Sequence, residues 1–276
     1  MNMRAVESER QLDMEYRLED RYRRENGTVF LTGTQTLVRI LVEQARSDRA
    51  AGINTGGLVS GYRGSPLGGF AQELWRQKTL LADHAIRFEP GLNEDLGATM
   101  LWGAQQVDAF PGKRVDGVFS MWYGKGPGVD RTGDVFRNAN ILGTSRQGGV
   151  LAVAGDDHAA QSSMFPHQTD HVFEGAMMPI LFPASVEEYI EFGLTGYAMS
   201  RFSGLWVAFK AITETVESGR SMTVQGHGAD AALRFRLPAD IQIPEVRGFN
   251  YDPNLRWPAE RDELERRVLD ERLPAG

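Results

Sequence analysis

The sequence predicts an α/β fold, in which a doubly wound, mostly parallel sheet is flanked by helices. Short apolar runs alternate with segments of helical periodicity from about residue 34 to residue 209, which is typical of strands joined by crossover helices. One run, Gly149–Asp156 (G-V-L-A-V-A-G-D), is almost entirely apolar, as expected of a strand buried on both faces. The chain has 276 residues, of which 41% are hydrophobic and 24% are charged, a composition typical of globular domains.

The first 27 residues are expected to form a charged N-terminal arm, either a helix that docks on a partner or a solvated segment. Beyond it, the spacing of Leu37 and Leu41 favours a helix with one apolar face. Thr32 or Thr34 can cap the start of this helix, because a threonine hydroxyl accepts a hydrogen bond from a free N–H of the first turn. Gly52 is expected to end it.

Six strands are then predicted from short apolar runs bounded by residues that favour turns. They are Gly56–Tyr62, Ile86–Glu89, Val115–Trp122, Gly149–Asp156, Met178–Phe182 and Gly204–Phe209. The segments between most of them have the features of helices, and Asn93 and Ser185 are good N-cap residues at two of the starts. The predicted helices are Leu67–Asp83, Asn93–Phe110, Asp130–Gly143 and Ser185–Arg201.

The character of the sequence changes near Val224. Residues 231–260 contain four prolines without a clear periodicity. Residues 260–273 have the pattern of a charged helix with oppositely charged residues four positions apart. We therefore predict three regions: the arm (1–27), an α/β domain (28–224), and a linker with the start of an incomplete following region (225–276).

Composition excludes several kinds of site. The chain has no cysteine, which excludes disulfides, thiolate zinc sites, a cysteine nucleophile and an iron–sulfur cluster held by this chain. The formal net charge of −7 argues against nucleic-acid binding, which needs a basic face. No targeting segment is recognisable, and no apolar stretch approaches the roughly 20 residues of a membrane-spanning helix. These features predict a cytoplasmic protein that binds neither nucleic acid nor a membrane.

Four turns that follow predicted strands carry most of the chemically informative residues. Ligands of parallel α/β sheets bind beyond the carboxyl ends of the strands. The turns concerned are Tyr62–Gly69, Pro90–Glu94, Trp122–Asp130 and Asp156–Ser163. Because the carboxyl ends of parallel strands lie at one edge of a sheet, all four turns can face one site.

The second of these turns leads into a predicted helix. Asn93 can cap that helix, which puts Glu94 and Asp95 in its first turn, where the helix dipole favours negative charge. The simplest interpretation is a well-capped helix start. The functional interpretation is a carboxylate held at the sheet edge, where it can hydrogen-bond a ring nitrogen or a substrate.

The third turn, G-K-G-P-G-V-D at Gly124–Asp130, has three glycines in five residues. Glycine lets backbone N–H groups come close to a ligand, and Lys125 adds a positive charge. The segment is neither a P-loop nor a dinucleotide-binding fingerprint. It is therefore either a tight turn or a loop that contacts a ligand.

The fourth turn begins a segment rich in side chains that bind metals. Residues of the types that hold zinc or another transition metal are Asp156, Asp157, His158, His167, Asp170 and His171. A metal site built on His158, His167, Asp170 and His171 would make the chain a metal-dependent hydrolase. A serine hydrolase is a second alternative, with Ser162 or Ser163 as nucleophile and His171 as base, although no G-x-S-x-G motif is present. The third alternative is a polar loop with helix caps.

Residues 62–171 contain, in order, the strings Y-R-G-S-P-L-G-G, P-G-L-N-E-D-L-G-A, M-W-Y-G-K-G-P-G-V-D-R-T-G-D-V-F, A-G-D-D-H-A-A-Q-S-S and P-H-Q-T-D-H. In this order they closely resemble the N-terminal part of the large indolepyruvate ferredoxin oxidoreductase family. Members of that family are thiamine-diphosphate-dependent 2-oxoacid:ferredoxin oxidoreductases. The resemblance implies a thiamine diphosphate-binding fold of the pyrimidine-binding type for residues 28–224.

The resemblance also implies roles for single residues. Glu94 matches the family's N-E motif and so corresponds to the carboxylate that hydrogen-bonds N1′ of the aminopyrimidine and helps to activate the cofactor. The other residues that the resemblance places at the site are Gly64, Ser65, Asn93 and Lys125 for cofactor binding, and His158, Ser163 and His167 for the edge that faces the substrate.

The sequence departs from the family in two ways. It lacks the G-D-G motif of the diphosphate-binding domain, and it has no cysteine for clusters. The resemblance therefore implies that a partner domain or subunit shares the thiamine diphosphate and carries Mg²⁺ and the Fe–S clusters, and that this chain itself holds no metal. Oxidative decarboxylation of an aryl or other 2-oxoacid, with electrons passed to ferredoxin, then belongs to a homo- or hetero-oligomer. The alternative is a non-catalytic interaction module or relic, from a truncated or split enzyme.

Overall fold

Six strands form one parallel sheet in the computed structural model, which describes residues 13–161 and 163–226. The strands lie in the order β3-β2-β4-β5-β7-β6, and each neighbouring pair is parallel. Their bounds are β2 Thr55–Gly61, β3 Ile86–Phe88, β4 Gly117–Lys125, β5 Val150–Gly155, β6 Ile180–Leu181 and β7 Trp206–Lys210. The predicted mostly parallel α/β sheet is confirmed. The helix predicted at 260–273 and nearly all of the predicted linker lie outside the described residues.

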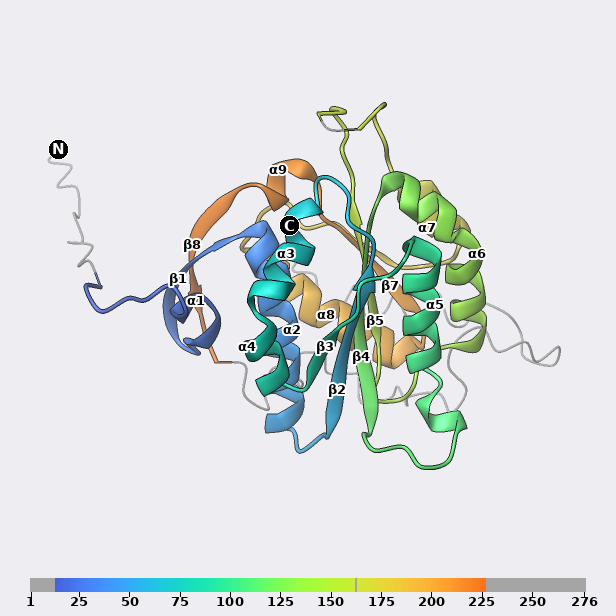
Figure 1. The fold of residues 1–276 in the computed structure, drawn as a ribbon, viewed down its shortest axis with the longest axis horizontal. Helices are drawn as coiled ribbons and strands as arrows, with labels where there is room; N and C mark the ends of the chain where they lie inside the picture. The colour runs from blue at the N-terminus through green and yellow to red at the C-terminus, as the bar shows by residue number, and fades with distance from the viewer. Residues whose placement is uncertain (1–12, 162, 227–276) are drawn as a thin grey trace, which may run out of the picture.

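Helices cover both faces of this sheet (Figure 1). One face carries α2 Gly33–Ala50, α3 Gly68–Arg76, α4 Lys78–Asp83 and α8 Glu188–Ser203, and the other carries α5 Glu94–Ala104, α6 Gly126–Leu142 and α7 Asp170–Gly175. Side chains of β5 alternate between two apolar cores: Leu151 and Val153 pack in one, and Val150, Ala152 and Ala154 in the other. The apolar run of this strand therefore reflects burial on both faces, as predicted.

Of two predicted N-cap residues, one caps its helix and the other does not. Thr32 caps α2 in a capping box, because its side chain accepts from the Gln35 N–H at 3.3 Å while the Gln35 side chain accepts from the Thr32 N–H at 3.0 Å. Gly52, with φ of 74°, follows this helix, as predicted. Ser185 does not cap α8, since its backbone carbonyl accepts from the Glu188 N–H and no side chain caps that helix.

Two other predicted helices are shorter than expected. Leu67–Asp83 is divided at Gln77, which leaves the helical conformation (φ −93°, ψ 17°) and separates α3 from α4. Asn93–Phe110 contains α5 and then only the short 3-10 turn η1 Val107–Ala109. No glycine or proline marks the break at Gln77, whereas Gly103 lies in the last turn of α5. Within residues 13–161 and 163–226, no helix is both long and apolar enough to cross a bilayer.

A second, two-stranded sheet was not expected. It pairs β1 Gly27–Thr32 with β8 Gly219–Val224 in antiparallel register, and α9 Thr213–Val216 leads into it from β7. Val29 and Leu31 of β1 are buried and Phe30 is exposed, so the strand has the alternation of a half-buried edge. The sequence pattern had indicated this segment only as the approach to α2.

The described part of the N-terminal arm packs against the domain. Only α1 Asp20–Arg23 is helical there, which contradicts a single long helix over residues 13–26. Tyr22 is buried, and its hydroxyl donates to Glu73 at 2.7 Å. The buried Arg39 of α2 donates to the carbonyls of Arg21 and Arg24. The end of the arm is therefore tied to α2 and α3 and is not a fully solvated segment.

Candidate functional site

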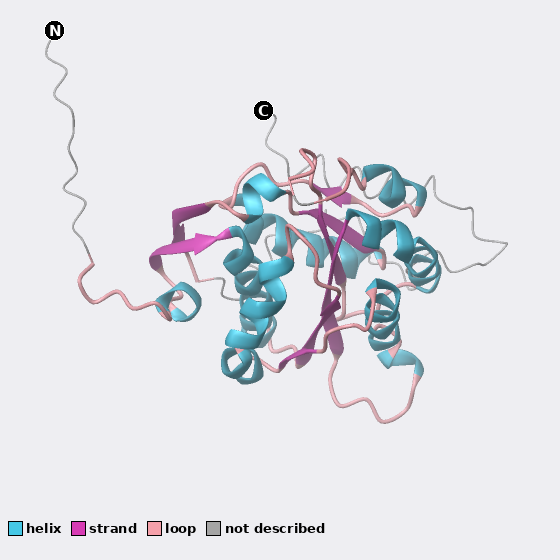
Figure 2. Cartoon of the chain, turned by 45° about the horizontal axis from the view of Figure 1, so that its top comes forward, coloured by secondary structure: helices cyan, strands magenta, loops and turns pink. Residues whose placement is uncertain are grey.

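The connections that follow β2, β3, β4 and β5 lie along one edge of the sheet, at the top of Figure 1. These strands end at Gly61, Phe88, Lys125 and Gly155, and their parallel direction brings the four ends together. The Gly91 N–H donates to the Gly61 carbonyl at 2.9 Å, which joins the β3–α5 turn to the end of β2. Figure 2 shows loops gathered along this edge. The four turns singled out from the sequence do share one edge.

Glu94 is the first residue of α5 and is only 8% exposed. Asn93 caps the helix, because its Oδ1 accepts from the Leu96 N–H at 2.9 Å. The indole N–H of Trp122 donates to the Glu94 carbonyl at 3.1 Å and so ties the helix start to β4. Among the described residues, no hydrogen bond or ion pair is seen for the Glu94 carboxylate, and its oxygens are not among the side-chain atoms that are both buried and without a partner. The carboxylate oxygens therefore keep some access to solvent, through which water or a ligand can supply a donor.

The G-K-G-P-G segment is not a loop. Lys125 is the last residue of β4, and α6 begins directly after it with Gly126, Pro127 and Gly128 in its first turn. Proline fits this position because the N–H groups of a first turn have no partner within the helix. The interpretation of the segment as a tight turn or loop is therefore wrong. What it places at the sheet edge is the start of a 17-residue helix.

Two glycines of this first turn lie directly beneath candidate side chains of the site. A Cβ atom at Gly128 would lie 2.6 Å from Glu94 Cγ, and one at Gly126 would lie 2.1 Å from His167 Nδ1. Both distances are too short for a real side chain, so each position requires glycine for close approach. Glu94 and His167 therefore both lie against the first turn of α6, Glu94 beside Gly128 and His167 beside Gly126, two positions that face different sides of the helix.

The β2–α3 turn lies against the same place. A Cβ atom at Gly64 would lie 2.8 Å from Lys125 Cδ, so the lysine side chain runs alongside this turn. Ser65 is half-buried next to it. Pro66 packs against the end of β5, where a Cβ at Gly155 would lie 3.0 Å from Pro66 Cδ. These residues meet at the strand-end edge, and their roles in cofactor binding stay predictions.

The three candidates for the substrate edge lie on the β5–α7 connection, residues 156–169. His167 Nε2 lies 2.9 Å from Asp130 Oδ2 on α6, and its side chain is 9% exposed. Its Nδ1 is buried without a hydrogen-bond partner among the described residues. His158 is exposed, 3.7 Å from Asp156 Oδ2, and Ser163 is half-buried. Of the three, His167 is seen to contact the start of α6.

A buried cluster of charges behind this connection was not predicted. Lys210, the last residue of β7, is fully buried, with Nζ 3.2 Å from Asp156 Oδ2 and hydrogen-bonded to Asp170 Oδ2. Burial alone raises the pKa of Asp170, but the hydrogen bond and charge of Lys210 outweigh it and hold that pKa below its usual value. The available signal was the lysine that ends the apolar strand G-L-W-V-A-F-K, since a buried lysine needs a counter-charge.

The metal and hydrolase alternatives find no support in the geometry. Asp156 and Asp170 are engaged by Lys210. His171, the base of the hydrolase alternative, is 88% exposed and lies 3.7 Å from Glu174. In the part of the chain that the structure describes, no three His, Asp or Glu side chains are grouped to hold a metal ion.

Comparison with known proteins adds two findings, although no family model matches the chain. Indolepyruvate oxidoreductase subunit IorA of Methanothermobacter thermautotrophicus is 24% identical, over 88% of this chain and 37% of the relative. The structure of 2-oxoglutarate:ferredoxin oxidoreductase from Magnetococcus marinus, with 2-oxoglutarate, coenzyme A and succinyl-CoA bound, has the same fold. Its TM-score is 0.55 at 14% identity, over 89% of this chain and 44% of that one.

This chain thus spans less than half the length of either protein. The sequence relative, the shared fold and the ordered motifs agree. Together they show that the chain is similar in sequence to an indolepyruvate oxidoreductase subunit and shares the fold of a 2-oxoacid:ferredoxin oxidoreductase.

Proposed function

We propose that this chain is the pyrimidine-binding domain of a thiamine-diphosphate-dependent 2-oxoacid:ferredoxin oxidoreductase of the indolepyruvate type. We also propose that Glu94 holds the cofactor's aminopyrimidine through N1′. One observation carries the proposal: Glu94, a residue that is 8% exposed at the strand-end edge, has a carboxylate with no partner among the described residues. A protonated N1′ presents a ring N–H, which is a donor of the kind that such a carboxylate needs.

A second feature, the glycines at the start of α6, also fits an aminopyrimidine. Gly126 and Gly128 leave bare backbone at the start of α6, where any side chain would collide with His167 or Glu94. A flat ring can therefore approach Glu94 closely. When bound, thiamine diphosphate supplies a carbon that adds to the 2-oxo group and takes up the electron pair released with CO₂. Glu94 holds or exchanges the proton at N1′.

The proposal includes a partner domain or subunit. The sequence has no G-D-G motif and no cysteine, so the diphosphate, Mg²⁺ and the Fe–S clusters are assigned to other domains or chains. Electrons then reach ferredoxin through that partner. Indolepyruvate, or another aryl 2-oxoacid, is proposed as substrate because the motifs and the curated relative both point to that group.

The test compares Glu94→Gln with Asp95→Asn in the enzyme reconstituted with the partner that supplies the diphosphate site. Asp95 is the next residue of the same helical turn, but its carboxylate pairs with Arg131 at 2.9 Å. We expect Glu94→Gln to lower turnover of indolepyruvate by about 10²–10⁴-fold, the range for loss of a proton-transfer group. Asp95→Asn is expected to stay within about threefold of the wild type.

Both variants are checked for an unchanged fold by circular dichroism. Near-normal turnover in Glu94→Gln would remove Glu94 from the mechanism. Absence of thiamine diphosphate binding in the wild-type complex would instead favour the non-catalytic interaction module.

A further inference from the structure

Lys210 is a fully buried cation for which the proposed function has no use. Its Nζ contacts two carboxylates, Asp156 and Asp170, and lies 4.6 Å from the centre of the Phe182 ring. The side chain of Asp156 is itself fully buried, and that of Asp170 is 29% exposed. Side chains of this kind are rarely placed in a protein interior unless their position serves the structure around them.

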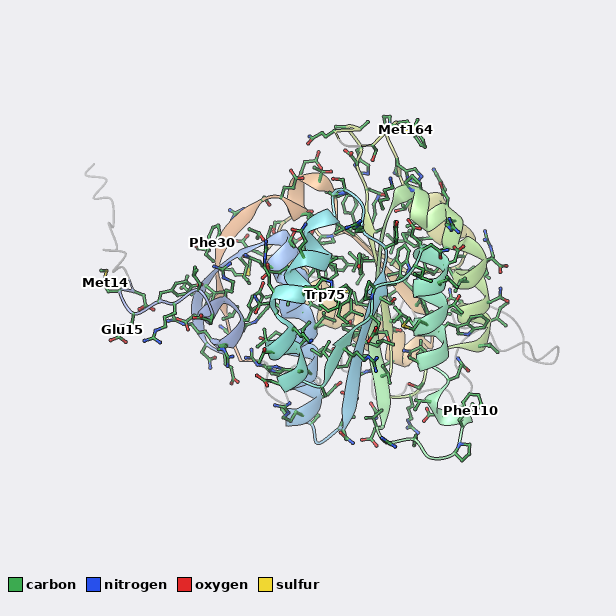
Figure 3. The ribbon with its side chains drawn as sticks, in the orientation of Figure 1. Met14, Glu15, Phe30, Trp75, Phe110 and Met164 are labelled. Atoms are coloured by element: carbon green, nitrogen blue, oxygen red, sulfur yellow. The ribbon has the colours of Figure 1, made fainter. Side chains whose placement is uncertain are left out.

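The two carboxylates lie at opposite ends of the β5–α7 connection. Asp156 is the first residue after β5, and Asp170 is the first residue of α7. Asp156 Oδ2 also accepts from the backbone N–H of Thr169 at 3.1 Å and from its hydroxyl at 3.0 Å. Lys210 therefore lies at the base of the connection and holds its two ends together. The exposed Met164 lies farther along the same connection, at the top of the molecule (Figure 3).

The contacts that hold the two ends of the β5–α7 connection together also set the position of His167. His167 is two residues before Thr169, and its N–H donates to the Asp157 carbonyl at 3.4 Å, so the two sides of the connection are also joined there. From this position its ring reaches α6, with Nε2 bonded to Asp130 and Nδ1 against Gly126. Opening the base would move His167 away from the start of α6.

We propose that Lys210 is a positioning residue. By holding Asp156 and Asp170 together it keeps His167 at the first turn of α6, across that turn from Glu94. The function proposed above places the cofactor beside Glu94, and on that basis His167 borders the space for the 2-oxoacid. The placement of His167 itself does not depend on the proposed function.

The placement is tested with the full 276-residue chain and needs no activity. Lys210→Met removes the charge at similar length and leaves the Asp156 carboxylate buried and uncompensated. We expect at least tenfold faster amide hydrogen exchange in the peptide that contains His167. We also expect the imidazole NMR signals of His167, assigned with His167→Gln, to move toward those of the exposed His171. The double variant Lys210→Met/Asp156→Asn should keep both changes, because it removes the uncompensated charge at position 156 but restores no link between positions 156 and 170.

The matched control is Arg201→Met. Arg201 forms a two-bonded ion pair with the buried Asp48 at the opposite end of the sheet, at 2.6 and 2.7 Å. Breaking it should lower global stability and leave the His167 signals unchanged. Unchanged His167 signals in Lys210→Met, or equal changes in Arg201→Met, would overturn the proposal. If Lys210→Met does not fold, Asp170→Asn decides, with faster exchange at His167 expected and no change counting against it.

A second measurement addresses the 2-oxoacid. In the reconstituted enzyme, Lys210→Met is expected to raise the KM for the 2-oxoacid at least fivefold, with the affinity for thiamine diphosphate unchanged. If the apparent affinities for the 2-oxoacid and for thiamine diphosphate fell by the same factor, Lys210 would not act on the substrate side. If the wild-type complex has no thiamine-dependent activity, the proposed function fails, and the exchange and NMR results still decide whether Lys210 positions His167.

Discussion

At the scale of single residues, the site depends on two side chains that lie directly on a helix backbone. Glu94 lies against Gly128 and His167 against Gly126, so the two glycines define how closely those side chains approach α6. A methyl group at either position would collide with the side chain above it. The glycines are therefore as specific a requirement of this site as the charged residues are.

Gly128→Ala tests this requirement. The new Cβ would lie 2.6 Å from Glu94 Cγ and 2.7 Å from Glu94 Oε1, so the carboxylate must move. We expect turnover of the reconstituted enzyme to fall at least tenfold, because proton transfer depends on the position of the group. The control is Gly103→Ala in α5, where a Cβ would meet nothing within 4 Å. It should keep full turnover and raise the free energy of unfolding by about 0.5–1 kcal/mol. Equal behaviour of the two variants would contradict the assigned role of Gly128.

Some of these residues could be singled out from the sequence and others could not. Glu94 and Asn93 were found because a capped helix start after a strand is a local pattern. The contact of His167 with Gly126 joins residues far apart in the chain, and no local pattern reports it. Lys210 gave a signal, a charge at the end of an apolar strand, but its partners could be identified only in the fold.

At the scale of elements, strands were predicted more accurately than helix ends. The six strands of the main sheet lie at or within a few residues of their expected positions, because buried apolar runs are a strong signal. The start of α6 was missed because three glycines and a proline normally indicate a turn. Here two of the glycines, Gly126 and Gly128, and the proline occupy a first helical turn, where proline is tolerated and glycine allows close approach.

The capping box of α2 supports a measurable prediction. Thr32→Ala removes the acceptor for the Gln35 N–H and should lower the free energy of unfolding by about 1 kcal/mol. Thr34→Ala, two residues later, removes a threonine that caps nothing and should stay within about 0.5 kcal/mol of the wild type. Urea denaturation of both variants checks this. A loss in Thr34→Ala as large as that in Thr32→Ala would show that the cap contributes no more than threonine packing.

At the scale of the whole molecule, the class of the fold was predictable and the order of its strands was not. Alternating strands and helices indicate a parallel sheet, but nothing local places β3 outside β2 or β6 outside β7. The pairing of β1 with β8 joins the two ends of the domain and was missed for the same reason. The site could be assigned to one sheet edge because that follows from the class alone.

Stability of the whole molecule should depend on pH through His84. Burial lowers the pKa of this histidine, at the amino end of the sheet, below its usual value. The unfolded chain therefore binds the proton at a higher pH than the folded chain, and folding stability is lost as pH falls below about 6.5. His84→Gln should reduce this loss, as measured by urea denaturation between about pH 7.5 and pH 5.5. The control is His171→Gln, whose side chain is exposed. An unchanged pH dependence in His84→Gln would exclude this histidine as its source.

The β1–β8 pair has a consequence for synthesis of the chain. β1 spans residues 27–32 and its only described neighbour, β8, spans residues 219–224. At about 5–20 residues per second, roughly 10–40 s separate the appearance of the two strands at the ribosome. During that time β1 is an unpaired edge, with Val29 and Leu31 open to the edges of other nascent chains. A chaperone that covers the first strands should therefore raise the yield of folded protein more than one that acts only after release.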